Sequence, residues 1–416
     1  MFLDRWESVG PSIGLSTRGD DVGVGPSLDI AGPPGMMSVM ADSSPTVARV
    51  SGWVTVYRLH DIGYAIDLAA ASEALSPVAA ARARPARGEA QAIQIANPPL
   101  WIPLGAQACS IESNDYELTL SARVFDFGVC ALQARVAVRP GLSWEAFAVL
   151  GPRLENAEPV ADAFARSLDR VTTMLGPTVE RPDLSPVSES YVVFRVTALA
   201  SDDGTPASPS GLTDAAIALL LLNENQPLSS VARSELLHHR FSYYEDDLAV
   251  LTWDNALVID PRTADEDVEY ILEFANAQLL ELRVYDASLD AELPQMYDRI
   301  AAARGFGVAA DLTSSRLPLR QVLAGLQTRV ADVTETVERA ENALKVTDDV
   351  YLARLYAGAL EIFRGNAWRR GVDRKLEIMR QTYAMLNDEA QRARSHRLEV
   401  TIVVLIIAEL AVALLR

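Results

Sequence analysis

Two adjacent histidines, His238 and His239, are the first residues that could do chemistry in this chain of 416 residues. Imidazole rings bind metal ions and transfer protons near neutral pH. Neighbouring side chains point to different sides of a helix or a strand, so one metal ion would need further ligands from elsewhere. Only two other histidines, His60 and His396, are present. We therefore expect neither a metal site nor a bound cofactor.

Two acidic runs, Asp246–Asp247 and Asp265–Asp267, offer carboxylates that could hold a cation. The first run lies at an expected turn. The second lies in the first turn of an expected helix, where the helix dipole favours carboxylates. Capping and solvation therefore explain both runs better than a cation site. An acid–base site would have to gather groups from several elements, and the alternative that stays open is an enzyme using Asp126, Glu245 and His238.

Short catalytic motifs are missing from the sequence. It has no GxxxxGK[ST] phosphate loop and no GxSxG nucleophile elbow. Only Lys345 and Lys375 are lysines, and both fall in a charge-rich helical pattern. The two cysteines, Cys109 and Cys130, are too few for a disulfide framework or a four-cysteine zinc site. We therefore expect no catalytic residues and predict that the protein is not an enzyme.

The formal net charge of -19 argues against a nucleic acid as the main ligand. Affinity for phosphates comes largely from counterion release by clustered cations. No basic surface is expected in the folded part.

The elements that would position any site form an α+β or α/β unit with a central sheet, expected over residues 47–310. It follows a Gly-, Pro- and Ser-rich segment, residues 1–46, that we expect to be disordered. Strands are predicted at residues 51–59, 116–138 (two strands separated near Asp126–Gly128), 189–199 and 242–260 (two strands turning at Asp254–Asn255). Helices are predicted at residues 65–75, at 143–154 with Ser143 as N-cap, at 214–222, and at 263–282 after a Thr263–Glu266 capping box.

Long amphipathic helices are predicted after this unit. Apolar residues spaced by three and four form one seam from Leu319 to Leu344 and a second from Leu352 to Leu386. Two long helices joined by a short loop bury such seams by lying antiparallel. We therefore expect a coiled-coil-like hairpin over residues 311–397, through which copies of the chain self-associate.

The last residues, 398–416, are predicted to form a transmembrane helix. Leu398 to Leu415 is 18 residues, roughly 27 Å of helix, close to the hydrocarbon thickness of a bilayer. Glu409 is the one costly residue near its centre. The alternative is a buried helix in a soluble core.

The residues before this helix predict its orientation. Nine Lys or Arg stand against four acids between Arg364 and Arg397, opposite in sign to the whole chain. The positive-inside rule then places the folded part in the cytoplasm of a bacterium, with a single pass through the inner membrane, or in the matrix if the membrane is the mitochondrial inner membrane. The same cations could contact anionic lipids, so a lipid sensor is a third reading.

Candidate site residues lie at the expected membrane edge. Arg397 can extend its guanidinium to the headgroups, while Glu399 pairs with a cation on a neighbouring helix. Glu409 either hydrogen-bonds another copy of the helix or reaches toward the far interface. The full set of expected membrane or oligomer contacts is Arg392, Arg394, Arg397, Leu398, Glu399 and Glu409.

The sequence resembles the family that contains bacterial YagE and the eukaryotic "required for meiotic nuclear division" proteins. The resemblance is carried, in order, by VTVYRLHDIGYAIDL, VFDFGVCAL, FANAQLLELRVYDASLD and SHRLEVTIVVLIIAEL, within residues 52–416. Val400 stands where the family usually has Trp, and the aromatic at the end of the Phe-rich strand is missing, so this chain would be a divergent member. The resemblance implies a membrane-anchored, oligomeric protein of unknown biochemical function, whose mitochondrial relatives are tied to organellar translation, and it supplies no catalytic residues.

Together these observations predict a non-enzymatic, tail-anchored membrane scaffold. Its expected partners are the lipid bilayer, a second copy of the chain and unidentified proteins. The alternative is a membrane-associated enzyme with an unrecognised site in the α/β unit.

Overall fold

The computed structural model describes residues 47–75, 81–82, 94–95, 97–112, 114–222, 228–262, 266–305, 344–345 and 349–414, with isolated positions between 325 and 335. Side chains are described for these residues except 81–82, 94–95, 299–305, 344–345, 389–398 and 412–414. The expected disordered segment, residues 1–46, and Thr263 of the expected capping box lie outside the described residues.

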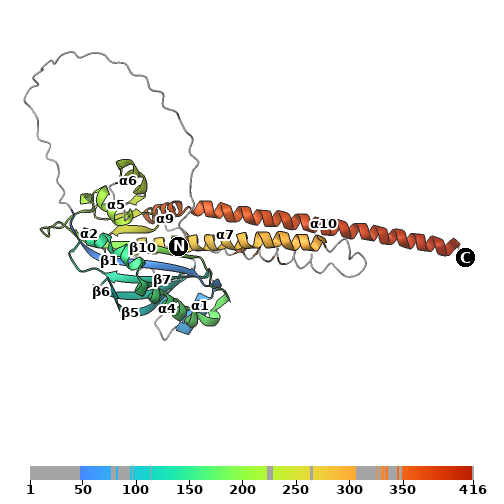
Figure 1. The fold of residues 1–416 in the computed structure, drawn as a ribbon, viewed down its shortest axis with the longest axis horizontal. Helices are drawn as coiled ribbons and strands as arrows, with labels where there is room; N and C mark the ends of the chain where they lie inside the picture. The colour runs from blue at the N-terminus through green and yellow to red at the C-terminus, as the bar shows by residue number, and fades with distance from the viewer. Residues whose placement is uncertain are drawn as a thin grey trace, which may run out of the picture. The chain divides into compact units, whose positions relative to one another are not determined.

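A mixed sheet lies at the centre of the described unit, with strand order β11-β12-β13-β10-β1-β7-β6-β5-β3 and β8 paired to β1 (Figure 1). All neighbours are antiparallel except β10 and β13. The strands are β1 (Arg49–Asp61), β3 (Ala81–Arg82), β5 (Leu100–Ile111), β6 (Asn114–Val124), β7 (Val129–Ala137), β8 (Leu142–Ser143), β10 (Ser188–Ala200), β11 (Arg240–Phe241), β12 (Leu248–Leu251) and β13 (Asn255–Ile259).

The sheet and helices confirm the predicted mixed α/β unit. Strands β1, β6, β7, β10, β12 and β13 fall where alternating or β-branched runs predicted them. Strand β5 was not predicted because Pro103 and Gly105 interrupt its pattern; the structure accommodates them with a break in the register between these two residues. Smaller pairs join β2 (Gly63–Ile66) to β9 (Val179–Pro182) and β4 (Gln94–Ile95) to β14 (Leu344–Lys345).

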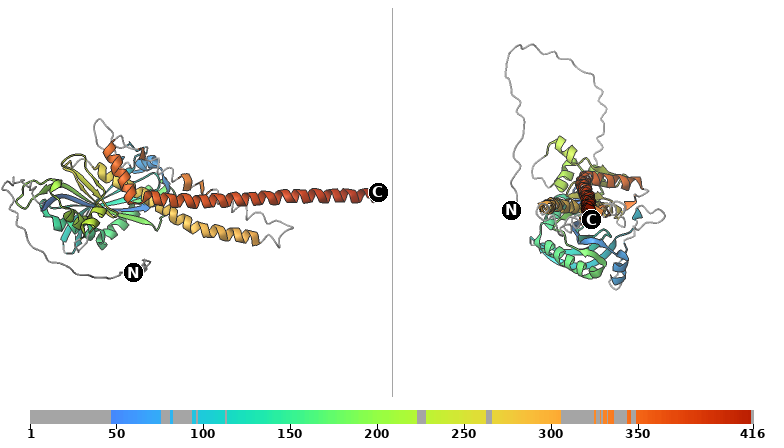
Figure 2. Two further views of the ribbon diagram at one scale, coloured as in Figure 1. Left: turned by 90° about the horizontal axis from the view of Figure 1, so that it is seen from above. Right: turned by 90° about the vertical axis from the view of Figure 1, so that its right-hand side faces the viewer.

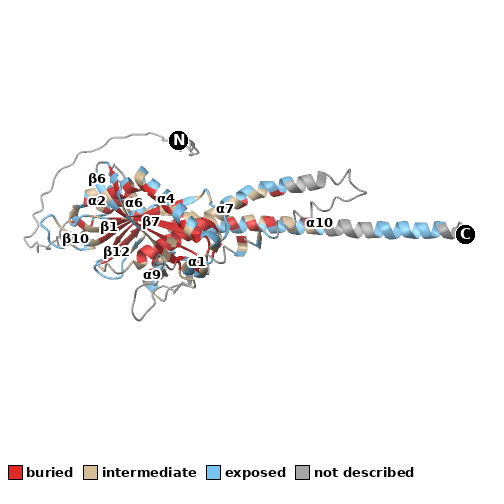
Figure 3. Ribbon diagram, turned by 90° about the horizontal axis from the view of Figure 1, so that it is seen from below, coloured by how far each residue is buried: buried red, intermediate tan, exposed pale blue. Residues whose placement is uncertain are grey.

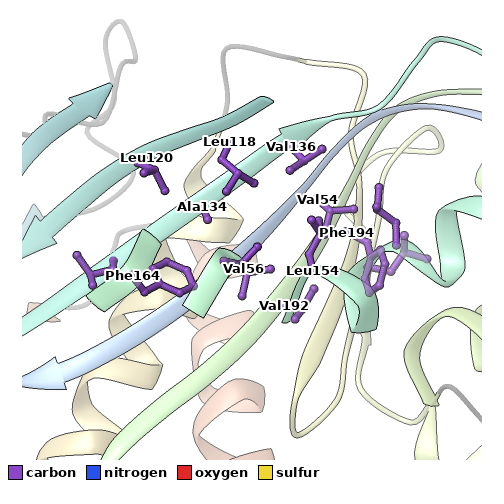
Figure 4. Packing of buried hydrophobic residues seen from close by; sticks show 14 of the residues in the cluster. Val54, Val56, Leu118, Leu120, Ala134, Val136, Leu154, Phe164, Val192 and Phe194 are labelled. Carbon is purple, nitrogen blue, oxygen red and sulfur yellow. The ribbon is translucent and has the colours of Figure 1, made fainter. Parts of the chain in front are cut away.

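One face of the sheet packs against the shorter helices, as Figure 4 shows from close by. Val54 and Val56 on β1 alternate with residues of the other face and meet Phe164 and Phe194 in one apolar cluster. The helices around this cluster are α1 (Leu68–Leu75), α2 (Trp144–Ala148), α3 (Leu150–Glu155), α4 (Glu158–Leu175) and α5 (Asp214–Leu222), with α6 (Ser230–Leu236) beside α5. Ser143 caps α2 by accepting a hydrogen bond from the Ala146 amide at 3.2 Å, as predicted.

The opposite face is covered by α7 (Asp267–Gly305) and α9 (Val350–Ile362). Apolar α7 residues such as Ile271, Phe274 and Ala275 are fully buried there with Phe125 and Phe127 of the β6–β7 turn. The helix predicted at residues 263–282 is thus confirmed from Asp267 onward, but it continues to Gly305.

The predicted helix over residues 352–386 is wrong as one continuous element. Helix α9 ends at Ile362 and α10 (Gly365–Leu414) begins three residues later, because Arg364 takes a left-handed conformation with φ of 51°. Helix α10 then runs for 50 residues, about 75 Å at about 1.5 Å per residue.

Helix α10 also lies beside α7, a pairing that the sequence did not predict, and the two helices run in the same direction (Figure 2). Arg283 contacts Trp368, and Asp286 and Asp290 contact Lys375 further along both helices. The pairing is therefore parallel. Most of the first expected helix, residues 319–344, lies outside the described residues; within it Val333 is buried between α7 and α10.

Within the helices whose side chains are described, none has a stretch both long and apolar enough to cross a membrane. Leu398 and residues 412–416 of the expected span lie outside that part of the chain.

Candidate functional site

Three arginines of the sheet meet three carboxylates at the start of α7. The arginines come from β6, β7 and β10 and all point to the α7 face, where an apolar residue would be usual. The carboxylates recur every three or four residues, which places them on one side of the helix. The pairs are Arg123–Glu273, Arg135–Glu266 and Arg195–Glu269.

We call these three ion pairs the charged seam. Arg195 is its most buried residue, with a side chain 0% exposed. Its Nη1 donates to both carboxylate oxygens of Glu269 at 2.8 Å, and its Nη2 donates to the carbonyl oxygen of Arg262 at 3.0 Å. The Trp53 ring lies 5.7 Å from the same guanidinium. Arg195 therefore ties α7 to β10 and to the segment that leads into α7.

The other two pairs extend the seam across the sheet. Glu273, fully buried, accepts from Arg123 and from the Gln133 amide at 2.9 Å. Arg135 forms two parallel hydrogen bonds with Glu266 at 2.8 and 2.9 Å. Paired and hydrogen-bonded charges of this kind are the form in which proteins tolerate buried ions.

Burial and pairing act in opposite directions on these carboxyl groups. Burial raises the pKa of Glu269 to about 7, although Arg195 opposes the rise. Burial also acts against ionised Glu266, but the paired bonds from Arg135 outweigh it and lower the pKa of Glu266. A carboxyl that titrates near neutrality can exchange protons, yet Glu269 is only 4% exposed and both its oxygens are bound by Arg195. The seam is therefore positioned for structure rather than for catalysis.

Sequence reasoning did not identify this seam. The signals were an arginine inside each of three strands and the spacing of Glu266, Glu269 and Glu273. Neither signal identifies the partner, because the pairing joins residues 74 to 150 positions apart.

Beyond the sheet, α7 and α10 are held together by an apolar seam and a lysine. Lys375 on α10 lies 2.7 Å from Asp286 and 2.6 Å from Asp290 on α7. Burial would lower the pKa of Lys375, but the hydrogen bonds and attraction of these two carboxylates outweigh it and raise the pKa. The apolar seam beside it consists of Leu289, Met296, Val333, Val372, Leu376, Met379 and Leu386.

The last described part of α10, residues 399–411, is exposed on every side, as the pale blue end of the helix in Figure 3 shows. Eight large aliphatic side chains there are 47–64% exposed. They are Val400, Ile402, Val403, Val404, Leu405, Ile406, Ile407 and Leu410. Consecutive positions cover the whole circumference of a helix, so no single neighbouring helix could bury them all.

The predicted membrane-edge residues lie along this helix. Glu399 and Glu409 are exposed. Arg392, Arg394, Arg397 and Leu398 belong to the continuous α10 backbone, but their side chains lie outside the described part. Thirteen described residues at about 1.5 Å each span roughly 20 Å, which is shorter than a bilayer core.

The alternative acid–base site is not assembled. Asp126 lies in the β6–β7 turn and accepts a hydrogen bond from Asn97, whereas His238 and Glu245 flank the edge strand β11. Five strand spacings of about 4.8 Å, roughly 24 Å along the sheet, separate β11 from β7. This is far beyond the hydrogen-bond reach that shared acid–base work requires.

The two adjacent histidines and the acidic run Asp246–Asp247 make contacts that hold the local structure. His238 and His239 stack edge to face on each other, with centroids 5.3 Å apart. Asp247 accepts the amides of Tyr243 and Tyr244 and pairs with Arg262, and Asp246 lies 3.6 Å from the same arginine. Among the described residues, no group of three His, Cys, Asp or Glu is placed to hold a metal ion.

Comparison with known proteins gives two matches. A family model described as "Uncharacterized protein MJ0711, N-terminal domain" matches residues 51–266. The uncharacterized protein MJ0711 of Methanocaldococcus jannaschii is 28% identical over 196 residues, which covers 47% of this chain and 58% of that protein. The match thus spans less than two thirds of the relative's length. No solved structure matches the chain.

Proposed function

This chain belongs to the family described as the N-terminal domain of the uncharacterized protein MJ0711, and from that premise we propose that it is a non-enzymatic, membrane-anchored scaffold. The family model ends at residue 266, one position before α7 begins. The proposal rests on the helices that follow. In it, residues 398–415 enter a bilayer, and α7 with α10 forms a stalk that carries the folded unit.

The observation that carries the proposal is the exposed apolar end of α10. Water does not tolerate an isolated helix with aliphatic side chains on every side, whereas lipid does. Twelve Leu, Ile and Val residues between 398 and 415 contribute roughly -4 to -7 kcal/mol on the insertion scale, against about +3 kcal/mol for a central charge such as Glu409. Insertion into the bilayer is therefore favoured, but by a net free energy smaller than the cost of two charges added at the centre of the helix.

Charge supports an orientation for this anchor. Among the cations between Arg364 and Arg397, those with described surroundings are mostly exposed and include Arg364, Arg369, Arg370, Arg374 and Arg380. A cationic stalk beside the bilayer favours the side with anionic lipids and follows the positive-inside rule. In the proposal the folded unit therefore lies in the bacterial cytoplasm, or in the matrix if the membrane is mitochondrial.

The length of the stalk also sets the distance between the folded unit and the bilayer. Trp368 contacts α7 near the sheet, and Glu399 begins the apolar end. About 31 helical residues separate them, or roughly 47 Å at about 1.5 Å per residue. A domain held at that distance can bind soluble partners without contact with the bilayer.

The proposal includes self-association, but through a different surface from the predicted seams of the long helices. The seam residues Val372, Leu376, Met379 and Leu386 are buried against α7 within one chain. We therefore place contact between copies in the apolar end, where Glu409 can hydrogen-bond across helices. The resemblance to the YagE family stays a prediction.

Carbonate extraction of membranes from cells expressing the full chain tests the anchor. We expect the chain in the membrane pellet, and the double variant V404D/I407D in the soluble or aggregated fraction, because two acids cost about 5–7 kcal/mol at the bilayer centre. The matched control is M385D, a charge placed at an apolar position 51% exposed on the same helix, which should stay in the pellet. Recovery of the unaltered chain in the carbonate supernatant would refute the proposal.

A further inference from the structure

Three tyrosine rings from two separate elements line one small cavity of the folded unit, which we call the tyrosine cavity. Tyr243 and Tyr244 follow β11, and Tyr351 lies in the first turn of α9. The rings of Tyr243 and Tyr244 meet edge to face with centroids 4.8 Å apart, and the Tyr351 ring lies 5.8 Å from that of Tyr243. Tyr243 is 64% exposed and Tyr244 53%. Exposed aromatic side chains gathered in one place are typical of binding surfaces.

The loop that carries the first two rings is held by one buried carboxylate. Asp247 is 8% exposed and accepts the backbone amides of Tyr243 at 2.8 Å and Tyr244 at 3.1 Å. It also accepts a hydrogen bond from Arg262 at 3.1 Å. Both tyrosines are therefore positioned before a ligand arrives, which lowers the entropy lost on binding.

The lining of the tyrosine cavity is acidic. Four aspartates and one arginine are among its lining residues, namely Asp247, Asp260, Asp267, Asp349 and Arg262. Glu245 and Asp246, which follow Tyr244 in the sequence, are exposed and add negative charge. Such a cavity repels phosphate groups and attracts cations, which argues against nucleic acids and anionic lipid headgroups as its ligands.

Arg262 shows how this surface holds a guanidinium group. That group lies 4.4 Å from the centre of the Tyr244 ring and pairs with Asp260 at 2.6 Å and with Asp247 at 3.1 Å. An aromatic face and carboxylates thus act on the same cation, by cation–π attraction and by charge-assisted hydrogen bonds. The tyrosine cavity offers the same two kinds of group to a second cation, with the ring of Tyr243 among them.

We propose that the tyrosine cavity binds an arginine side chain from an extended basic segment of a partner protein, with the guanidinium over the Tyr243 ring. The cavity has a volume of about 150 Å³, below the usual range of small-molecule sites, so it suits one side chain rather than a whole metabolite. Arginine fits better than lysine, because its planar head can stack on a ring and bind carboxylates at the same time. The inference rests on the proposed scaffold role, for which it names a class of partner.

Fluorescence anisotropy of a labelled peptide, added to the full chain in non-ionic detergent, tests the proposal. The probe is a peptide of alternating glycine and arginine. The matched probe carries citrulline, which keeps the shape of arginine without its charge, at every arginine position. We expect the arginine peptide to bind and the citrulline peptide to bind at least about tenfold more weakly. No binding of the arginine peptide at up to about 1 mM, or equal affinity for the two peptides, would overturn the proposal.

Variants separate the tyrosine cavity from the general attraction of an acidic chain for basic peptides. Tyr243→Leu keeps an apolar side chain but removes the aromatic ring, so it should weaken binding at least about threefold, whereas Tyr243→Phe keeps the ring and should retain binding. The matched control is Tyr297→Leu, which removes a tyrosine that is 53% exposed on α7 and outside the cavity lining, and it should leave binding unchanged. No loss in Tyr243→Leu, or an equal loss in Tyr297→Leu, would contradict the assignment.

The outcome is separable from that of the membrane anchor, because the peptide is added to detergent-solubilised protein. A chain that binds the arginine peptide but is recovered in the carbonate supernatant would refute the anchor alone. A chain that stays in the membrane pellet but does not bind the peptide would refute the arginine site alone.

Discussion

Replacing Arg195 by methionine is the sharpest test of the charged seam under α7. Methionine fills a similar length of apolar space but donates no hydrogen bond. In the Arg195→Met variant Glu269 would lose the cation that binds both of its oxygens, and the carbonyl oxygen of Arg262 would lose the donor at 3.0 Å. Both groups would stay in a region from which water is excluded, because the arginine side chain is 0% exposed and the glutamate 4%.

The expected loss follows from these contacts. Removing one partner of a buried ion pair costs about 3–5 kcal/mol, and a buried carbonyl left without its donor adds about 1 kcal/mol. We therefore expect Arg195→Met to lower the free energy of unfolding by about 4–6 kcal/mol at pH 8. The double variant R195M/E269L replaces the pair by apolar groups and should recover most of that loss.

The loss should also depend on pH, with a definite sign. Burial already raises the folded-state pKa of Glu269 to about 7, above its value in an unfolded chain, and loss of Arg195 raises it further. Folding then takes up a proton, so the variant loses stability as pH rises from about 5 toward and through that folded-state pKa. Relative to the unaltered protein, Arg195→Met should be less destabilised at pH 5 than at pH 8.

Guanidinium unfolding followed by tryptophan fluorescence measures these quantities, since Trp53 lies beside the substituted residue. Arg240→Met is the matched control, because Arg240 pairs with Asp214 at a surface where the two side chains are 34% and 54% exposed, and it should cost less than about 1 kcal/mol. A loss below about 1 kcal/mol for Arg195→Met, or no recovery in the double variant, would refute the reasoning.

Three further substitutions probe other parts of the molecule. Lys375→Met leaves Asp286 and Asp290 without their shared cation and should cost about 1–3 kcal/mol, measured by guanidinium unfolding. Gly151→Ala places a Cβ 2.3 Å from the buried Phe194 ring and should cost about 1–3 kcal/mol, seen as a lower Tm. For Asp61, whose pKa burial raises to about 7 in the folded chain, above the unfolded value, folding binds a proton, so its contribution to stability is lost as pH rises from about 4 through 7. Asp61→Asn should therefore melt at a temperature that falls less between pH 5 and pH 8 than that of the unaltered chain.

The sequence predicts those parts of the fold that depend on residues close together in the chain. Alternating apolar residues placed β1, β6, β7 and β10, because their two faces have different surroundings. Helix α4 was not predicted, although Val160, Ala163, Phe164 and Val171 mark a buried helical face. The break between α9 and α10 depends on one residue, Arg364, in a conformation that arginine rarely adopts.

The candidate sites also differ in whether neighbouring residues in the sequence are enough to find them. The apolar end of α10 is a property of consecutive residues and can be found from the sequence. The charged seam and the tyrosine cavity require the pairing of distant elements. Tyr243 and Tyr351, for example, line one cavity from the loop after β11 and the first turn of α9. A local pattern cannot supply that register, so the proposed Asp126, Glu245 and His238 site failed for the same reason.

Helix α7 couples the family domain to the stalk. The family match ends at residue 266, yet Arg195 and Arg123, which lie inside that match, are neutralised by Glu269 and Glu273 beyond it. Without α7 in register, the sheet would keep buried guanidinium groups with no carboxylate, at a cost of several kcal/mol for each. The same helix continues to Lys375 and the apolar seam against α10. A force applied to the stalk is carried along α7 to the three ion pairs of the charged seam. The folded unit and the stalk therefore resist being moved apart.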